Sequence, residues 1–325
     1  MRRLVLTSLA TALGSVAFAS FDLFIMPDSV SGNHARYDPI NRVSLGTVNV
    51  ASNNSVVATN GRPYGYYRYA SGSVAAVNNY TGERLSGFQS INGGMSMSSD
   101  GTRVGLTAGN TFVIMNSSSA ILTTVATFGA PAGFVAHGSI SVSGGRWVVY
   151  GLSSAGNLDL YLVSGAGAQI GSLLNVVSST SLTSVGTGGL GQGAVFMRQS
   201  VERFVIPYRD NTGAHRLVTN TVLFGSTAFQ TLSGYSVANV GTTLATVAGH
   251  QGFFVVGADQ TTSTLTRIQE MDDLQTFVPL QNYTTNSMSA PVGTQWRMAN
   301  IVAPEPGTMA ALGLGVLALL KRRKK

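Results

Sequence analysis

Residues 62–69 hold the densest set of side chains in the sequence that could bind a ligand. Two arginines and four tyrosines occur there: Arg62, Tyr64, Tyr66, Tyr67, Arg68 and Tyr69. Tyrosine rings offer flat amphipathic faces and arginines offer planar hydrogen-bond donors, which is chemistry that binds sugars or protein partners. Side chains alternate between the two faces of a strand, so alternate members could instead pack inside a sheet. The stretch therefore predicts either a binding surface or a packed strand.

The residue types that usually catalyse reactions or hold metals do not form a local motif. The four histidines are widely separated, at His34, His137, His215 and His250, and none has the spacing of a metal motif. No Gly-x-Ser-x-Gly sequence of a serine hydrolase occurs. The chain also has no cysteine, which excludes disulfides, thiol catalysis and cysteine metal sites. We therefore expect no catalytic residue, no metal and no cofactor, and a protein that is not an enzyme.

Two further motifs have a structural interpretation. Residues 186–191 match the G-x-G-x-x-G pattern of dinucleotide sites. That pattern requires a following helix, whereas residues 194–197 and 204–208 resemble strands, so we expect a flexible turn. Residues 270–273 form the only acidic cluster, Glu-Met-Asp-Asp. We expect a solvated hairpin turn there rather than a calcium site.

The net charge of +7 and the pI of about 9.9 come from the ends of the chain. Two arginines lie within the first three residues, and the last five residues are all basic. Between Ser20 and Val302 there are 13 arginines, 12 acidic residues and no lysine. Nucleic-acid binding needs a sustained basic field, which this region lacks. We therefore expect no nucleic-acid partner.

The N-terminal residues have the features of a signal peptide. A basic start at Arg2 and Arg3 is followed by an apolar stretch from Leu4 to Phe18. Ala17-Phe18-Ala19 then provides an A-x-A cleavage site before Ser20. Residues 1–19 are therefore predicted to direct export and to be removed.

The C-terminal residues have the features of a second targeting segment. Pro304-Glu305-Pro306 precedes 14 uncharged residues, Gly307 to Leu320, and then five basic residues. The prolines prevent a preceding element from continuing into the apolar segment. As a helix the segment would cover about 21 Å of the roughly 30 Å hydrocarbon core. Snorkelling of the basic side chains shortens that gap and holds the chain end in the cytoplasm.

This arrangement resembles the PEP-CTERM sorting signal, over about 24 of the 325 residues. The resemblance implies that an exosortase, a membrane enzyme of some bacteria, recognises Pro304, Glu305 and Pro306. It also implies that residues 303–325 enter the membrane only transiently and are then removed. A plain C-terminal membrane anchor is the alternative. The signal does not specify the role of the protein that carries it.

Residues 20–302 are predicted to form an all-β domain, a β-propeller of six four-stranded blades. Strand-like segments recur in groups of four every 40 to 55 residues, which is the repeat of a blade. Five blades are expected at residues 52–90, 91–131, 132–179, 180–233 and 234–282. Both termini are expected to complete the sixth blade, with residues 295–301 as its inner strand and residues 21–27 and 43–50 as outer strands. Five or seven blades, or a pair of β-sandwiches, are the alternatives.

The outermost strand of each complete blade is predicted from the last apolar run of its repeat. These runs are residues 84–88, 120–125, 169–174, 228–232 and 274–280.

These features favour an exported cell-surface or exopolymer-matrix protein whose propeller is a binding or structural scaffold. Its expected partners are an exosortase-like enzyme, the membrane transiently, and polysaccharide or surface proteins. The alternative is a secreted hydrolase or lyase that acts on polysaccharide at the propeller axis. It requires charged side chains to converge there, and the acidic residues to locate are Asp22, Asp28, Asp38, Asp100, Asp159, Glu202, Asp210 and Asp259.

Overall fold

The computed structural model describes the greater part of the region between Ser20 and Ala303. The described residues are 20–27, 33–38, 43–49, 55–58, 64–69, 73–90, 96–117, 121–171, 173–182, 189–198, 200–225, 227–235, 244–248, 252–261, 266–272, 279–285 and 296–303. The predicted signal peptide and the residues after Ala303 lie outside these ranges. Within the ranges, no helix is long and apolar enough to cross a membrane.

The described strands form six four-stranded antiparallel sheets. Five sheets use consecutive strands: β4–β7 (Ser55–Ala58, Tyr64–Arg68, Ser73–Asn78, Gln89–Ser90), β8–β11 (Ser96–Ser99, Arg103–Ala108, Thr111–Asn116, Thr123–Gly129), β12–β15 (Val135–Val142, Arg146–Leu152, Leu158–Val163, Leu174–Val177), β16–β19 (Ala194–Arg198, Val201–Arg209, His215–Thr221, Ala228–Thr231) and β20–β23 (Ala245–Ala248, Gly252–Ala258, Thr266–Asp272, Pro279–Thr285). Two short 3₁₀ turns, η1 (Ser143–Gly145) and η2 (Ser179–Ser181), lie between strands of this set.

The sixth sheet combines the two ends of the described chain. Its order is β24 (Trp296–Ala303), β1 (Ser20–Pro27), β2 (Asn33–Asp38) and β3 (Val43–Asn49). The β1–β24 ladder pairs eight residues, from Ser20 opposite Ala303 to Pro27 opposite Trp296. The inner strand of this sheet therefore comes from the C-terminal side, as the sequence predicted. The third strand, β2, was missed.

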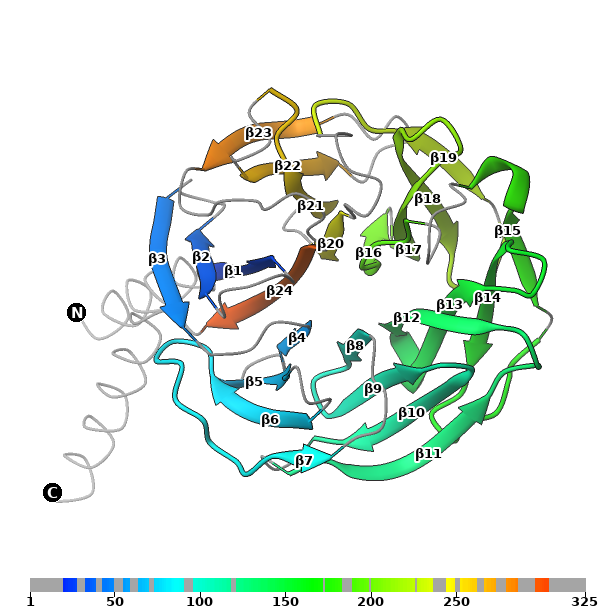
Figure 1. Cartoon of the computed structure of the whole chain (residues 1–325), viewed down its shortest axis with the longest axis horizontal. Coiled ribbons are helices and arrows are strands. Elements are labelled where there is room, and N and C mark those ends of the chain that lie inside the picture. Colours follow the sequence, from blue (N-terminus) through cyan, green and yellow to red (C-terminus); the bar gives the residue numbers. More distant parts are fainter. Residues whose placement is uncertain are drawn as a thin grey trace, which may run out of the picture.

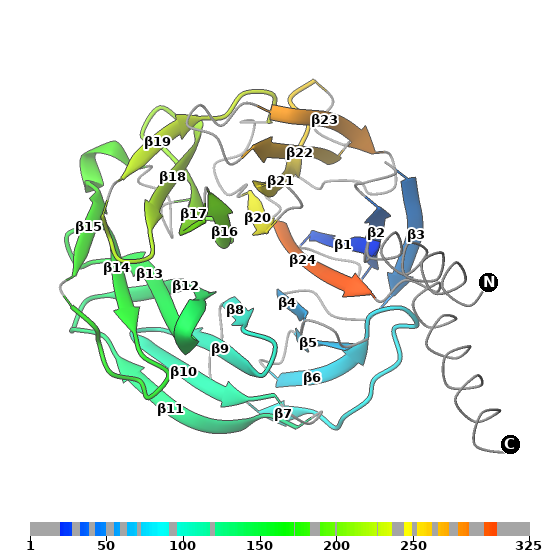
Figure 2. The same cartoon turned by 180° about the vertical axis from the view of Figure 1, so that it is seen from behind.

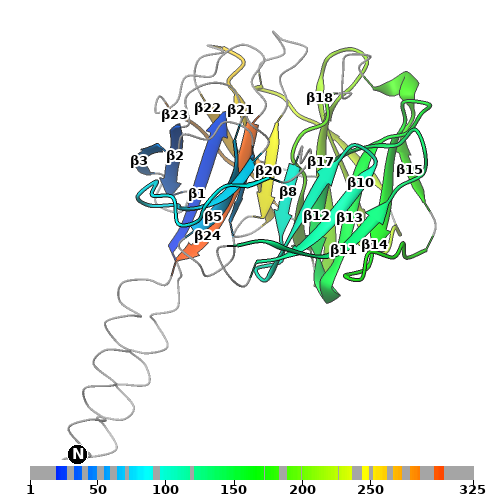
Figure 3. The same ribbon diagram turned by 60° about the horizontal axis from the view of Figure 1, so that its bottom comes forward.

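The sheets are arranged in a ring with the first strand of each repeat innermost (Figure 1). The inner strands contact one another in the order β4, β8, β12, β16, β20, β24 and back to β4. The reverse view shows the same ring, and the side view shows β8, β12 and β20 crossing it from one face towards the other (Figures 2 and 3). The prediction of a β-propeller is confirmed, and the six sheets match the expected number of blades.

Burial follows from this arrangement, because each sheet packs between two others. The second and third strands of a sheet are covered on both faces, and β14 and β21 are buried at every position. Such strands are continuous apolar runs instead of alternating ones. An outermost strand pairs with another strand along one edge only, and β11 is mostly exposed.

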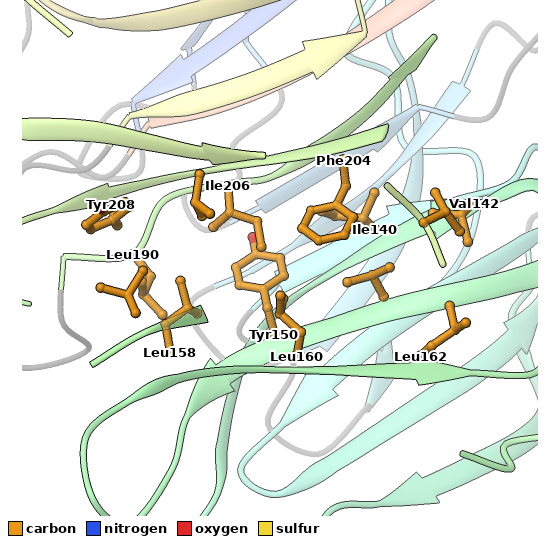
Figure 4. Packing of buried hydrophobic residues seen from close by; sticks show 14 of the residues in the cluster. Ile140, Val142, Tyr150, Leu158, Leu160, Leu162, Leu190, Phe204, Ile206 and Tyr208 are labelled. Atoms are coloured by element: carbon orange, nitrogen blue, oxygen red, sulfur yellow. The ribbon is translucent and has the colours of Figure 1, made fainter. Parts of the chain in front are cut away.

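The largest group of buried apolar side chains fills the space between the β12–β15 and β16–β19 sheets (Figure 4). Ile140, Tyr150 and Leu160 come from the first sheet, and Phe204 and Ile206 from the second. The Tyr150 hydroxyl donates to the carbonyl of Gly191 at 2.8 Å. It also accepts from the backbone N–H of Gly193 at 2.9 Å, so its polar end is satisfied inside the core.

Three outermost strands begin later than predicted. β7, β15 and β23 start at Gln89, Leu174 and Pro279, five residues after the predicted starts. The predicted segments near Arg84 and Gln169 each form a single bridge before the ladder begins. β11 also starts three residues late, at Thr123, whereas β19 starts at Ala228 as predicted. An outer strand has little buried apolar surface, so hydrophobicity marks its bounds poorly.

The acidic cluster is not a turn. Glu270 and Asp272 lie in β22, and Glu270 is opposite Phe254 of β21 and Gln281 of β23. Glu270 is buried there. The prediction of a solvated hairpin turn is wrong for these residues because β22 is an interior strand with ladders on both edges; Asp273 lies outside the described residues.

Candidate functional site

The tyrosine-rich stretch forms β5, the second strand of its sheet, and two of its rings are buried. Tyr66 and Tyr67 are both fully buried. The hydroxyl of Tyr67 donates to Asn79 Oδ1 at 2.5 Å, and that of Tyr66 to the carbonyl of Ser117 at 3.3 Å. Burial, together with the nearby Tyr69, raises the pKa of Tyr67. A ligand-binding role is therefore wrong for these two residues, which pack between neighbouring sheets as the alternative interpretation had it.

The other members of the stretch are nearer the surface. Tyr64, Arg68 and Tyr69 are half-buried, and Arg62 lies outside the described residues. The ring of Tyr69 meets Phe88 edge-on, with centroids 4.8 Å apart. Phe88 is 53% exposed, and the guanidinium of Arg84 lies 4.4 Å from the centroid of its ring. We call Tyr69, Arg84 and Phe88 the rim patch. Of these three residues, only Tyr69 was among the binding residues predicted from the sequence.

A pocket of about 360 Å³ lies between the β12–β15 and β16–β19 sheets. We call it the inter-sheet pocket. Its lining residues come from the end of β15 and the turn after it, from strands β17, β18 and β19, and from the turn between β17 and β18: Val176, Val177, Ser178, Ser181, Tyr208, Asp210, Asn211, Arg216 and Phe229. Tyr208 belongs to both the pocket and the apolar core beneath it (Figure 4). The volume is at the lower end of the range for small-molecule sites.

The turn between β17 and β18 fixes the charged side of the pocket. Asp210 Oδ1 accepts hydrogen bonds from the N–H and hydroxyl of Thr212 at 3.0 and 2.6 Å, and from the N–H of Ala214 at 3.0 Å. Asp210 Oδ2 accepts from Arg216 Nε at 2.6 Å. Burial alone would raise the pKa of Asp210, but these hydrogen bonds lower it overall. The carboxylate is therefore an ionised, fixed partner of Arg216.

The same turn recurs in the next sheet. Asp259 accepts hydrogen bonds from the N–H and hydroxyl of Thr261, and its Oδ2 lies 3.4 Å from Arg267 Nη1. Both turns follow the second strand of a sheet and share the order Asp-x-Thr with a later arginine. This recurrence is the signal by which the sequence could have revealed Asp210 and Arg216 as a pair.

Polar side chains also gather near the axis of the ring. His137 is the extra residue of a bulge in β12, between the pairs of Ala136 and Gly138. It is only 4% exposed, and among the described residues neither ring nitrogen has a hydrogen bond of good geometry. Burial, with a contribution from the buried Arg297 of β24, lowers the pKa of His137 to about 3. The imidazole is therefore neutral at physiological pH.

A glutamine joins two sheets near this point. Gln192 Nε2 donates to the carbonyl of Met298 at 2.6 Å, and the N–H of Met298 donates to Gln192 Oε1 at 2.9 Å. Gln192 follows the G-x-G-x-x-G motif, of which residues 189–191 are described. The backbone of Gly191 bonds to Pro207 and that of Gln192 to Leu244, so this part of the motif is held between sheets.

The seven acidic residues of this set that are described are spread over five sheets. Asp100, Asp210 and Asp259 lie in turns, each with an arginine partner. Asp159 accepts from Asn175, and Glu202 accepts from Ser143. Asp38 ends β2 and Asp22 lies in β1, whereas Asp28 is outside the described residues. Within the described ranges, no three His, Asp or Glu side chains converge as a metal site requires.

Comparison with known proteins identifies the C-terminal segment and the fold. Residues 302–325 match the PEP-CTERM protein-sorting motif. No curated protein matches the sequence. A chain of a nidogen–laminin complex is similar in structure, with a TM-score of 0.58 and 10% identity over 88% of this chain and 99% of that one. The WD40 domain of Toxoplasma gondii coronin gives a TM-score of 0.50 with 9% identity, over 88% and 80% of the two chains.

Identities this low establish the fold and nothing about function. The chain thus consists of a β-propeller that ends in a PEP-CTERM protein-sorting motif.

Proposed function

We propose that this protein is exported and then sorted to the cell surface or the extracellular matrix of a bacterium, where its propeller is a binding scaffold. The predicted signal peptide at residues 1–19 supports export. The sorting motif at residues 302–325 carries the proposal. An exosortase-like enzyme recognises Pro304, Glu305 and Pro306 and removes the tail, so that contact with the membrane is transient.

We propose a binding role in preference to a catalytic one. The carboxylates of Asp100, Asp159, Asp210 and Asp259 belong to four different sheets and already have hydrogen-bond partners, which supports this choice. The inter-sheet pocket is the binding surface that we propose, and the rim patch is a surface of similar composition in another sheet. They combine exposed aromatic rings with planar donors, as binding surfaces often do.

The sorting step can be tested by replacing Pro304, Glu305 and Pro306 together with alanine in the producing cell. The unchanged chain is expected in the envelope or medium, with a C-terminus that lies before the apolar segment. The triple variant is expected to stay in the membrane with its basic C-terminus intact. Cell fractionation and mass spectrometry of the mature C-terminus measure both outcomes. Glu83→Ala, at an exposed turn, is the control and should be sorted normally.

An unchanged chain that keeps its whole tail in the cytoplasm would contradict the proposal. So would normal processing of the triple variant, because recognition would then not depend on the motif.

A further inference from the structure

We propose that the inter-sheet pocket binds one neutral sugar ring of a polysaccharide. This inference rests on the proposed function, since it gives the binding scaffold a ligand class and a place. Three properties of the pocket support it: its balanced charge, its available hydrogen-bonding groups and its exposed aromatic ring.

The charge of the pocket is balanced internally. Arg216 and Asp210 are its only charged lining residues, and their ion pair is 2.6 Å long. Nη1 of Arg216 also donates to the hydroxyl of Thr231 at 2.7 Å. An anionic ligand would gain little attraction from Arg216, because the Asp210 carboxylate already neutralises its charge. A cationic ligand would gain little from Asp210 for the same reason, and Arg216 would repel it. The pocket therefore favours an uncharged ligand.

Several uncharged polar groups are available to such a ligand. Tyr208 lines the pocket, and its phenolic hydroxyl can both donate and accept a hydrogen bond. Nδ2 of Asn211 donates to the carbonyl of Thr180 at 2.7 Å, which leaves Oδ1 to accept. The hydroxyls of Ser178 and Ser181 lie 3.4 Å apart beside Asn211, and that of Ser178 is also 2.8 Å from the Thr180 hydroxyl. A hydroxyl can donate one hydrogen bond and accept two, so each retains capacity for a ligand. This mixture of donors and acceptors is complementary to a ring that bears several hydroxyl groups.

The pocket also offers an apolar surface for the C–H face of such a ring. Phe229 of β19 is 53% exposed although it borders a polar pocket. Val176 of β15 is half-buried on the other side. A sugar ring has one face of C–H groups and an edge of hydroxyls, so it can contact Phe229 and the polar groups together. A wholly apolar ligand would leave the tyrosine, asparagine and serine groups without partners.

The rim patch provides a matched comparison. Phe88 has the same exposed fraction as Phe229, 53%, but lies beside β7 in another sheet. Truncation of either ring removes similar exposed apolar surface and leaves the core intact. Tyr208→Phe removes a single hydroxyl and keeps the ring that packs in the core. Leu223→Ala, at a residue that is 74% exposed in the turn after β18, controls for a general surface effect.

The experiment uses the full-length chain in mild detergent, applied to an array of neutral and uronic-acid oligosaccharides and unrelated peptides. The best neutral oligosaccharide is then titrated by calorimetry. We expect Phe229→Ala to weaken binding roughly tenfold and Tyr208→Phe about fivefold. Phe88→Ala and Leu223→Ala should bind like the unchanged chain. Circular dichroism melts verify that each variant is folded.

Each other outcome overturns the proposal in an identifiable way. Loss of binding in Phe88→Ala with retention in Phe229→Ala would move the site to the rim patch. Selective binding of uronic-acid oligomers or peptides would overturn the ligand class. If no oligosaccharide binds while the protein is still sorted to the cell surface, the pocket assignment fails and the proposed location stands. If the tail is never processed, the location fails independently of any binding result.

Discussion

His137 is a buried, neutral histidine, and its position makes the stability of the propeller depend on pH. The folded chain does not protonate it until about pH 3, whereas the unfolded chain does so near the ordinary value of 6.5. As the pH falls between these values, the free energy of unfolding should drop by up to about 1.4 kcal/mol per pH unit from this residue. In His137→Gln that part of the slope should be absent. Urea denaturation at several pH values between 7 and 4 measures it.

Val149→Ala is the control for this prediction. It removes buried apolar surface from the neighbouring strand β13, so it should lower the free energy of unfolding at every pH and keep the original slope. If His137→Gln retains the full slope, another group is responsible for the pH dependence.

Asp259 should stabilise the fold in the ionised state. Burial would raise its pKa, but hydrogen bonds from Thr261 and Arg267 lower it overall. Its contribution is therefore complete above about pH 3.8 and is lost as the pH falls through the lower folded-state value. Asp259→Asn should reduce the free energy of unfolding at pH 7 by about 1–3 kcal/mol. The difference from the unchanged chain should shrink below pH 4.

The exposed Glu83 gives the matched comparison for acidic residues. Glu83→Gln should change the free energy of unfolding by less than about 0.5 kcal/mol at either pH. A loss in Asp259→Asn that persists undiminished at pH 3 would mean that packing, and not the charge, is what the carboxylate contributes.

At the level of elements, the outermost strands have no charged residue in any of the six sheets. Charged side chains, lysine above all, commonly protect an exposed strand edge from pairing with another molecule. In this protein the outermost strands are instead either irregularly paired or short. Pairing to β3, β11, β15 and β23 is interrupted by bulges, and β7, β15 and β19 have two to four residues. Both features limit the length of ladder that a second chain could form.

A single side chain joins β24 to the segment before β16. Gln192 holds the N–H and carbonyl of the buried Met298, so Gln192→Ala leaves both groups without these partners. We expect the free energy of unfolding to fall by about 2–4 kcal/mol. Gln230→Ala is the control, because that side chain bonds only the carbonyl of the next residue, and it should be nearly neutral. Equal effects in urea denaturation would show that the Gln192 contacts add nothing.

The sequence predicted interior strands better than it predicted edges or sites. The segments predicted at residues 21–27 and 295–301 match β1 and β24 to within two residues at each end. Residues such as Leu85 and Leu173 are apolar but exposed, and they place the predicted outer strands too early in the chain. Tyr66 and Tyr67 illustrate the same limit for sites. Composition identified an unusual strand, but only the packing of neighbouring sheets determines which rings reach the surface.

For the whole molecule, the sheet built from both ends is the critical element. A chain that ends at Gln295 lacks β24, so β1 loses one of its two ladders and the Gln192 side chain loses its partner Met298. We expect it to unfold at a markedly lower temperature and to be cleaved rapidly by protease. A chain that ends at Ala303 keeps every described strand and should match the full-length protein. Circular dichroism melts and limited proteolysis compare the two, and equal melting temperatures would contradict this role of β24.

The pairing of Ser20 with Ala303 also places both ends of the described chain side by side in one sheet. Ala303 ends β24, and the sheet that contains β24 lies across the ring from the sheet of β12 to β15 that borders the pocket (Figure 1). In the proposed function, we therefore expect the attached tail to tether the propeller from the side opposite the pocket. The same geometry would let the protein engage material outside the cell before it is cut free.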